Sequence, residues 1–276
     1  MQQIANTESP SHYDHLETKS VQELIAAINK EDASIAKIVQ AALPQIEQLI
    51  IAAFAKMTIG GRLFYIGAGT SGRLGILDAA EIPPTYGVND NVVIGIIAGG
   101  DTAIKHAVEF AEDDTSQAWK DLELHHISSR DFLIGIAASG ETPYVFGGIK
   151  MASEKGIGTG CIVCNPNRKI AQVTEYPVEL NTGAEFVTGS TRMKAGTAQK
   201  MVLNMISTSL MIQLGKVSGN KMVEMKLSNN KLWHRAATML SAELDIDTGA
   251  AAALVKKHGS VKQAIKAYRL TRQIIL

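Results

Sequence analysis

The sequence predicts an α/β fold with three layers, in which helices cover both faces of a parallel sheet. Short apolar runs alternate with amphipathic helical patterns from about residue 61 onward. Apolar strands separated by helices imply a parallel sheet that is covered on both faces. Loops rich in Gly, Ser and Thr follow several of the runs, at the strand ends where such sheets bind ligands. N-terminal helices and a small C-terminal helical appendage are expected to flank this domain.

Residues 1–56 form the first predicted region. The polar stretch over residues 1–15 is expected to be disordered. Apolar residues at helical spacing predict two helices after it, over about 20–29 and 33–57. Pro44 lies inside the second pattern, so it should kink or divide that helix.

The second predicted region, residues 57–220, carries the sheet. Its apolar runs are LFYIG, VVIGIIA, FLIGIAA, GTGCIVC and YPVEL. Helices are expected from about residues 72, 101 and 142, and a long helix is expected over about 191–214. The apolar part of that long helix suits either the core or a subunit interface.

The third region, residues 221–276, is predicted to be a helical subdomain. Strands should stop at about Gly219, and three patterns near 231–244, 248–257 and 261–268 predict helices. Gly259 should end the middle helix. The chain finishes on the apolar run RQIIL, an unusual natural end that suggests a shortened chain.

Composition excludes several classes of function. Lys+Arg and Asp+Glu both total 27, so no net field attracts nucleic acid or an anionic membrane. The 5% aromatic content argues against base stacking and against a sugar-stacking groove. No apolar run reaches the ~20 residues of a membrane span, and the polar N-terminus does not resemble a secretory signal. We therefore expect a cytoplasmic protein that binds neither nucleic acid nor membranes.

Cys161 and Cys164 form a CxxC motif that could indicate redox chemistry or half of a metal site. The motif lies inside an apolar strand, where successive side chains alternate between faces. The sequence has no second cysteine pair to complete a zinc site. We interpret both residues as small buried hydrophobic side chains and expect no metal site.

Three hydroxyl-rich loops predict a site for a small phosphorylated polyol. The first is GAGTSGR at 67–73, and the others are AASGETPY at 137–144 and NTGAEFVTGSTRMKAGTAQK at 181–200. Small residues let an anion approach the backbone, the following helix offers free N–H groups, and hydroxyls add donors. The predicted contacts to phosphate and sugar are Thr70, Ser71, Ser139, Thr142, Ser190 and Thr191.

The first loop also matches the GxGxxG pattern of dinucleotide-binding folds. That interpretation needs an acidic residue at the end of the second strand, whereas here the strand runs into Ala98, Gly99 and Gly100. Asp101 lies beyond the expected spacing, and the loop lacks the GK[ST] of a P-loop. A phosphate monoester suits the hydroxyls of Thr70 and Ser71 better.

The order GAGTSGR, SGET and TGSTRMKAGTAQK resembles the sugar isomerase (SIS) family of phosphosugar-binding domains. LDAAEIPPTYG, AVEFAEDD and TGSTRMKAGTAQKMVLNMIST resemble, more narrowly, the family of N-acetylmuramic acid 6-phosphate etherases. The SIS resemblance covers about residues 57–220. Ala137 departs from the pattern, because many isomerases of the family carry a serine there.

The resemblance implies a reaction and two catalytic carboxylates. The reaction would be cleavage of a lactyl ether at C3 of a 6-phosphosugar by a homodimer, by elimination and hydration, without a metal or redox cofactor. Glu81 would be the acid and Glu112 the base. Pro83 and Pro84 should stop the helix just after Glu81, and Glu112 should lie near the end of the helix that starts at about 101.

The resemblance also leaves some roles open. Ser71, Ser139 and Thr142 match the phosphate-binding residues most directly, and Glu141 is expected to belong to the start of the helix after the second loop. One of Arg73, Arg192 and Lys194 is expected to bind the lactyl carboxylate, and Arg192 is counted with the substrate-binding residues. Two other functions share the fold: a non-catalytic phosphosugar sensor and an aldose–ketose isomerase.

Overall fold

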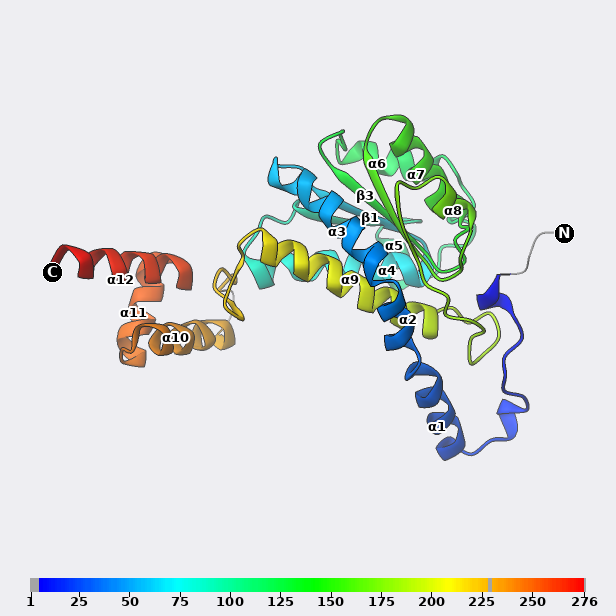
Figure 1. The fold of residues 1–276 in the computed structure, drawn as a ribbon, viewed down its shortest axis with the longest axis horizontal. Helices are drawn as coiled ribbons and strands as arrows, with labels where there is room; N and C mark the ends of the chain where they lie inside the picture. Colours follow the sequence, from blue (N-terminus) through cyan, green and yellow to red (C-terminus); the bar gives the residue numbers. More distant parts are fainter. Residues whose placement is uncertain (1–4, 228–229, 276) are drawn as a thin grey trace. The chain divides into compact units, whose positions relative to one another are not determined.

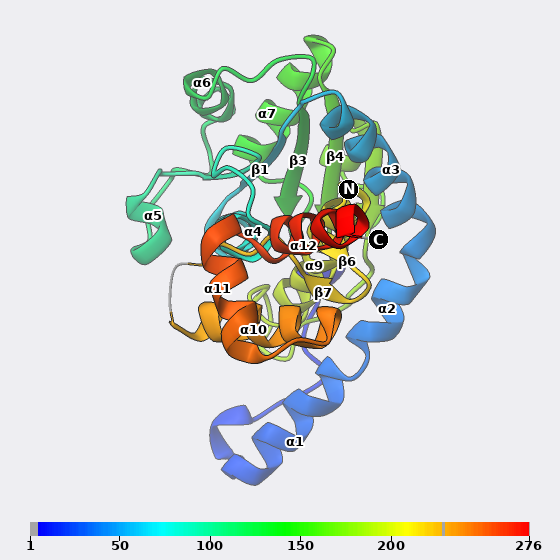
Figure 2. The same ribbon diagram turned by 90° about the vertical axis from the view of Figure 1, so that its left-hand side faces the viewer.

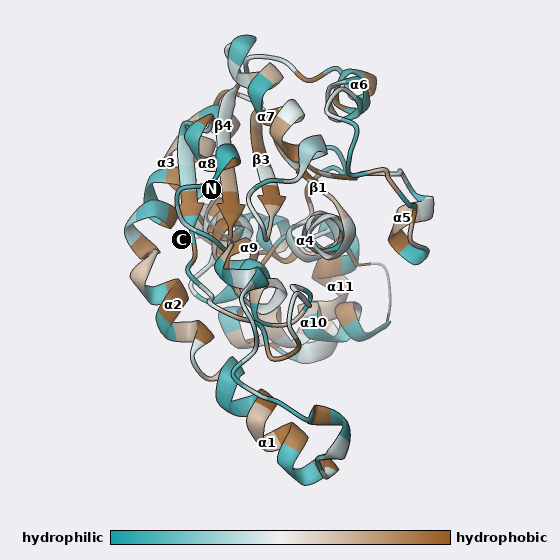
Figure 3. Cartoon of the chain, turned by 90° about the vertical axis from the view of Figure 1, so that its right-hand side faces the viewer, coloured by the Kyte–Doolittle hydropathy of each residue, from teal (hydrophilic) through white to brown (hydrophobic). Residues whose placement is uncertain are grey.

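The computed structural model describes residues 5–227 and 230–275 and confirms the predicted parallel sheet (Figure 1). Its strands are β1 (Leu63–Gly67), β2 (Val93–Ile97), β3 (Phe132–Ala137), β4 (Gly158–Val163) and β5 (Tyr176–Glu179). They pair in parallel in the order β2-β1-β3-β4-β5. Each strand lies within the apolar run that predicted it, and the hydropathy colours of Figure 3 show the apolar strands.

The strand order places a switch in direction between β1 and β3. The chain first passes from β1 to β2 on one side and then returns to β3 on the other side. Connections that leave neighbouring strands in opposite directions open a crevice at the carboxyl ends of those strands. The first and second Gly/Ser/Thr loops follow β1 and β3, so the topology brings both loops to this crevice.

Helices cover both faces of the sheet, as predicted. On one face, α6 (Gln117–Leu124), α7 (Pro143–Glu154) and α8 (Lys169–Gln172) pack over an apolar cluster that includes Phe64 and Ile66. The other face is covered by α3 (Leu43–Thr58) and α4 (Gly69–Tyr86). Glycines permit the close approach of α4: a Cβ on Gly95 of β2 would lie 2.8 Å from Ile76 Cα.

The N-terminal helices follow the predicted division at Pro44. The chain forms α1 (Val21–Asp32), α2 (Ile35–Ala41) and then α3, which starts with a proline in its first turn. The axis bends by 59° between the α1–α2 segment and α3. No single described helix is long and apolar enough to cross a membrane, although this bent pair together meets the length and composition required.

The structure differs from the predicted disorder of residues 1–15. Residues 5–15 are described, and they include a 3₁₀ turn over Asn6–Glu8; residues 1–4 lie outside the described part. Thr7 is fully buried, its backbone N–H donates to Asn165 Oδ1, and its hydroxyl accepts from Asn165 Nδ2. A long-range hydrogen-bond pair therefore orders a segment whose local composition predicts disorder.

Two helices have limits that differ from the predicted ones. The helix expected from residue 101 is only α5 (Thr102–Lys105), and turns follow it up to residue 116. The long helix α9 (Lys194–Gln213) starts three residues later than predicted. Its side chains Val202, Ile206 and Leu210 are fully buried, so the apolar part of α9 contributes to the core.

The chain divides into two compact units, Met1–Ala80 with Asn91–Leu210, and Glu81–Asp90 with Met211–Leu276. The second unit contains α10 (Asn230–Leu244) and α11 (Thr248–His258), which are close to the predicted limits, and α12 (Val261–Ile275), which extends beyond the predicted end at about residue 268 (Figure 2). Gly259, in the left-handed conformation, ends α11 as predicted. The sequence did not indicate the small hairpin of β6 (Val217–Ser218) and β7 (Lys221–Met222).

Candidate active site

The first loop is shaped by glycines between β1 and α4. A Cβ on Gly67 would lie 2.7 Å from Gly72 N, and a Cβ on Gly72 would lie 2.5 Å from Ile97 Cγ1. Gly69 has a φ of +52°, which an L side chain rarely adopts. The backbone of the first α4 turn can therefore lie directly against the strand ends, where its N–H groups suit an anion.

Ser71 connects this loop to α9. Its hydroxyl donates to Gln199 Oε1 at 2.9 Å, and both side chains are buried. Thr70 lies close to the same helix, since a Cβ on Gly196 would be 3.5 Å from Thr70 Cγ2. The start of α9, which carries the end of the third loop sequence, thus packs beside the first loop.

The second loop connects β3 to α7, and only some of its polar side chains make hydrogen bonds to the described residues. Ser139 Oγ accepts a hydrogen bond from the Glu141 backbone N–H at 3.2 Å. Thr142 is the N-cap residue of α7, and within the described chain its side chain makes no capping hydrogen bond. Glu141 forms an ion pair with Lys169 at 2.9 Å, which fits its expected structural place at this helix start.

The third loop differs from a phosphate-binding turn in one respect. The buried Glu185 carboxylate accepts the backbone N–H groups of Lys194 and Ala195, both at 2.9 Å, so it already occupies the anion-binding end of α9. Burial raises the pKa of Glu185 against the opposing effect of these hydrogen bonds. Ser190 and Thr191 are half-buried in the turns before α9.

The basic residues of the candidate site have different environments. Lys194 is 5% exposed, and its Nζ donates to Glu31 Oε2 at 2.8 Å and to the Ala184 carbonyl at 2.9 Å. Arg192 is exposed on the third loop. Arg73 is half-buried in α4, and its Nε donates to the Ile104 carbonyl at 3.0 Å.

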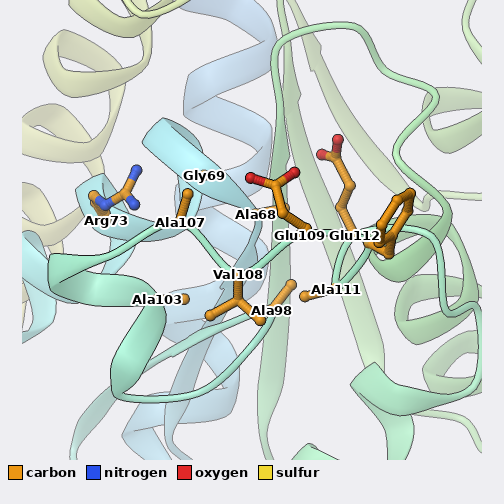
Figure 4. A pocket seen from close by; sticks show the side chains of 11 residues that line it. Ala68, Gly69, Arg73, Ala98, Ala103, Ala107, Val108, Glu109, Ala111 and Glu112 are labelled. Carbon is orange, nitrogen blue, oxygen red and sulfur yellow. The ribbon is translucent and has the colours of Figure 1, made fainter.

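A cavity of about 210 Å³ lies beside the first loop. It is lined by the start of α4, the end of β2 and the segment 107–112, and its lining residues are Ala68, Gly69, Arg73, Ala98, Ala103, Ala107, Val108, Glu109, Phe110, Ala111 and Glu112. Figure 4 shows the carboxylates of Glu109 and Glu112 extending to the same side of the segment that carries them. The predicted base therefore shares one cavity with the predicted phosphate-binding turn.

Glu112 lies in a turn, and the expectation that it ends a helix is wrong. Its carbonyl accepts the backbone N–H of Tyr144 at 2.9 Å, in the first turn of α7. Next to it, Gly147 of α7 allows close packing, because a Cβ there would lie 1.7 Å from the Thr115 carbonyl oxygen. These contacts from α7 hold the segment as a loop, and they fix the backbone from which the Glu112 side chain extends.

Glu81 belongs to the other compact unit and is exposed. The prediction that Pro83 and Pro84 stop its helix is wrong, because α4 continues to Tyr86. Pro84 leaves a carbonyl that accepts the Lys226 N–H at 3.1 Å, and Pro83 accepts the Gly87 N–H at 2.9 Å. The Pro83 bond is an ordinary helical one, and the Lys226 bond satisfies a carbonyl in the last turn of α4, whereas the prolines themselves lack the N–H groups that would donate to Ala79 and Ala80.

Two polar residues of the site were missed at the sequence level. Gln199 was part of the third loop sequence, but only the structure shows its hydrogen bond to Ser71. Glu109 lies in the same AVEFAEDD run as Glu112, and its acidic side chain gave no separate signal. Both positions depend on contacts between segments that are distant in the sequence.

The CxxC motif is structural, as interpreted. Cys161 and Cys164 are free thiols and are fully buried. Burial raises the pKa of Cys161 to about 12 and also raises the pKa of Cys164. Such thiols are protonated at neutral pH and poorly suited to redox chemistry.

Comparisons with known proteins agree with this geometry. Residues 34–153 match the family described as glucokinase regulatory protein N-terminal SIS domain. The structure of phosphoheptose isomerase from Neisseria gonorrhoeae is similar in fold, with a TM-score of 0.52 and 17% identity over 69% of this chain and 98% of that chain.

Similarity to curated proteins extends over nearly the whole chain. The N-acetylmuramic acid 6-phosphate etherase of Christiangramia forsetii is 58% identical over 97% of both chains. The N-acetylmuramic acid 6-phosphate etherase of Bacteroides thetaiotaomicron is 58% identical over 98% of this chain and 97% of its own length. Identity at this level, over both the sheet domain and its helical flanks, shows that the chain belongs to the N-acetylmuramic acid 6-phosphate etherase family.

Proposed function

We propose that this enzyme cleaves the D-lactyl ether of N-acetylmuramic acid 6-phosphate, giving N-acetylglucosamine 6-phosphate and D-lactate, in the recycling of cell-wall sugars. Family membership supports the substrate. The structural observation that carries the proposal is the cavity in which Glu112 and the first α4 turn lie together. A phosphate anchor beside a carboxylate base is what the chemistry of a 6-phosphosugar requires.

The phosphate would bind at the crevice between β1 and β3. The free N–H groups of the first α4 turn favour an anion, and Ser71, Ser139 and Thr142 can add hydroxyl contacts. Thr70, Ser190, Thr191 and Arg192 complete the proposed set of substrate contacts. Because Glu185 already caps α9, we assign the phosphate to the first and second loops, with the third loop contacting the sugar.

The reaction needs two groups that transfer protons, a base and an acid. Opening the sugar ring makes C1 an aldehyde, which acidifies the hydrogen on C2. We assign Glu112 as the base that removes this proton; the electron pair forms the C2–C3 double bond as the C3–O bond breaks. Glu81 is assigned as the acid that protonates the departing lactate oxygen. Water then adds its oxygen to C3, and C2 regains a proton.

Two further features belong to the same proposal. A homodimer is supported by the exposed apolar side chains of α1, where Val21 is 73% and Ile25 is 60% exposed, since such side chains favour burial against a partner. Light scattering of the purified protein gives its molar mass in solution and so tests for the homodimer.

Cytoplasmic location is proposed because a charged sugar phosphate crosses an apolar bilayer only at a high cost of desolvation.

The experiment that tests the function is a D-lactate assay with N-acetylmuramic acid 6-phosphate. We expect release of D-lactate by the wild-type protein and a loss of about 100-fold or more in kcat for Glu112→Gln and Glu81→Gln. Both variants should still bind N-acetylglucosamine 6-phosphate. Glu47→Gln, a change of an exposed glutamate on α3, is the matched control.

Other outcomes would contradict the proposal. A folded protein that binds the sugar phosphate without releasing lactate would indicate a sensor. Formation of a ketose from an aldose phosphate, again without lactate, would indicate an isomerase.

A further inference from the structure

We propose that Arg73 binds the lactyl carboxylate and thereby selects the lactyl ether over the same sugar phosphate without lactate. This inference rests on the proposed function and assigns a role within the same cavity. The sequence left three basic residues as candidates, namely Arg73, Arg192 and Lys194. The structure separates them by burial, by existing contacts and by position relative to Glu112.

Lys194 is already committed to an internal ion pair. Its ammonium group contacts Glu31 and the Ala184 carbonyl, and the residue is 5% exposed. Recruiting it to a substrate would leave the half-buried Glu31 carboxylate without this partner, at a considerable cost. Arg192 is exposed on the third loop and is not among the residues that line the cavity with Glu112.

Arg73 lines the same cavity as Glu112, and a hydrogen bond to the backbone holds its guanidinium group in place. Nε donates to the Ile104 carbonyl at 3.0 Å, which sets the plane of the guanidinium group. Among the described residues, its two terminal nitrogens have no hydrogen-bond or ion-pair partner within reach. An arginine that is anchored through Nε presents these nitrogens as a pair, and such a pair matches the two oxygens of a carboxylate.

The chemistry of the substrate brings its carboxylate to this cavity. The proposed base acts at C2, and the lactyl group is attached to the neighbouring carbon, C3. When C2 is at Glu112, the carboxylate therefore lies only a few bonds away. Figure 4 shows Arg73 and Glu112 toward opposite ends of the labelled lining residues, with Glu109 between them in this view, and both line the same cavity.

Charge also favours this assignment. Glu109 and Glu112 both line the cavity, and Arg73 is the only basic residue among the described lining residues. A substrate carboxylate entering next to two acidic side chains would be repelled without a cation. Glu109 and Glu112 are exposed, so solvent screens part of this repulsion, and the half-buried Arg73 supplies the one positive charge of the described lining when the substrate carries the lactyl group.

The test compares two ligands in a background without turnover. In Glu112→Gln protein, the affinities for N-acetylmuramic acid 6-phosphate and N-acetylglucosamine 6-phosphate are measured by calorimetry, with and without Arg73→Met. We expect Arg73→Met to weaken binding of the lactyl ether on the order of 100-fold. Binding of the lactate-free sugar should change less than about twofold, because Arg73 contacts only the lactyl group.

Controls separate this role from a structural one. Arg73→Lys keeps the charge but loses the paired nitrogens, so it should recover part of the preference. Arg130→Met removes an exposed arginine next to the opposite end of β3 and should leave both affinities unchanged. Equal weakening of both ligands by Arg73→Met, or no weakening of either, overturns the proposal. Neither result depends on lactate release, so a failure of the proposed function is detected separately.

Discussion

The hydroxyl of Ser71 can donate only one hydrogen bond, either to Gln199 Oε1 or to a bound phosphate. In the structure it donates to Gln199 Oε1, while Gln199 Nε2 is buried without a hydrogen-bond partner among the described residues. A bound phosphate would need that hydrogen for itself. Rotation of the Gln199 amide would then let Nε2 donate to Ser71 Oγ, which satisfies both groups. In the proposed site, Gln199 would therefore be a positioning residue that frees the Ser71 hydroxyl for the phosphate.

This arrangement predicts that Gln199→Glu weakens binding of N-acetylglucosamine 6-phosphate by about tenfold or more. A carboxylate can only accept, so it keeps the Ser71 hydrogen, and it places a negative charge near the phosphate. Gln199→Met removes the hydrogen bond without adding charge, so its effect should be smaller. Calorimetric titration with the sugar phosphate provides the comparison. Equal affinities of Gln199→Glu and the wild type would exclude the positioning role.

At the scale of residues, the sequence predicts an environment only where neighbouring residues determine it. Burial of Cys161 and Cys164 could be predicted, because an apolar strand determines it locally. The preference for Arg73 over Lys194 could not, because it depends on Glu31, which is 163 residues from Lys194 in the sequence. Glu112 was identified through family resemblance, and its catalytic role stays a prediction.

At the scale of elements, Asp131 joins the starts of two strands. Its carboxylate accepts from Arg62 Nη2 at 3.0 Å, from the Arg62 backbone N–H at 2.8 Å and from the Ser128 backbone N–H at 2.8 Å. Burial acts to raise the pKa of Asp131, but the hydrogen bonds from Arg62 and Ser128 outweigh it, so the pKa is lowered. Arg62 precedes β1 and Asp131 precedes β3, so this pair links the starts of neighbouring strands, at the opposite ends from the candidate active site.

A lowered pKa in the folded state implies a definite dependence of stability on pH. The stabilisation is fully present above the unfolded pKa of an aspartate, about 3.9, and is lost as the pH falls through the lower folded value. Asp131→Asn should therefore lower the free energy of unfolding by about 2 kcal/mol at pH 7. Urea unfolding at pH 7 and near pH 3 should show the deficit shrinking in acid. A deficit that is constant with pH would contradict the ionic contribution.

Elements were predicted well where local pattern decides them. The five strands and the division at Pro44 follow from apolar runs and from proline geometry. The helix predicted from residue 101 ends at Lys105, and contacts with Tyr144 and Gly147 of α7 hold the later segment 112–115 as a loop. The predicted helix stop at Pro83 is wrong, since α4 continues through both prolines to Tyr86.

At the scale of the whole molecule, strand order determines where the site lies. The order β2-β1-β3 brings the first and second loops to one crevice, and alternating strands and helices in the sequence were sufficient to expect binding at these strand ends. Glu185 limits the role of the third loop, which composition could not reveal. Removal of the C2 proton by Glu112, followed by its replacement from solvent, is the central claim of the proposed mechanism.

The most direct test of that claim is turnover of N-acetylmuramic acid 6-phosphate in deuterium oxide, followed by mass spectrometry and NMR of the sugar product. We predict one D-lactate for each N-acetylglucosamine 6-phosphate and one solvent deuteron at C2, because the C2 proton is removed and replaced from solvent. Release of lactate with the original hydrogen retained at C2 would contradict elimination and hydration. An absence of lactate from folded protein would contradict the etherase function itself.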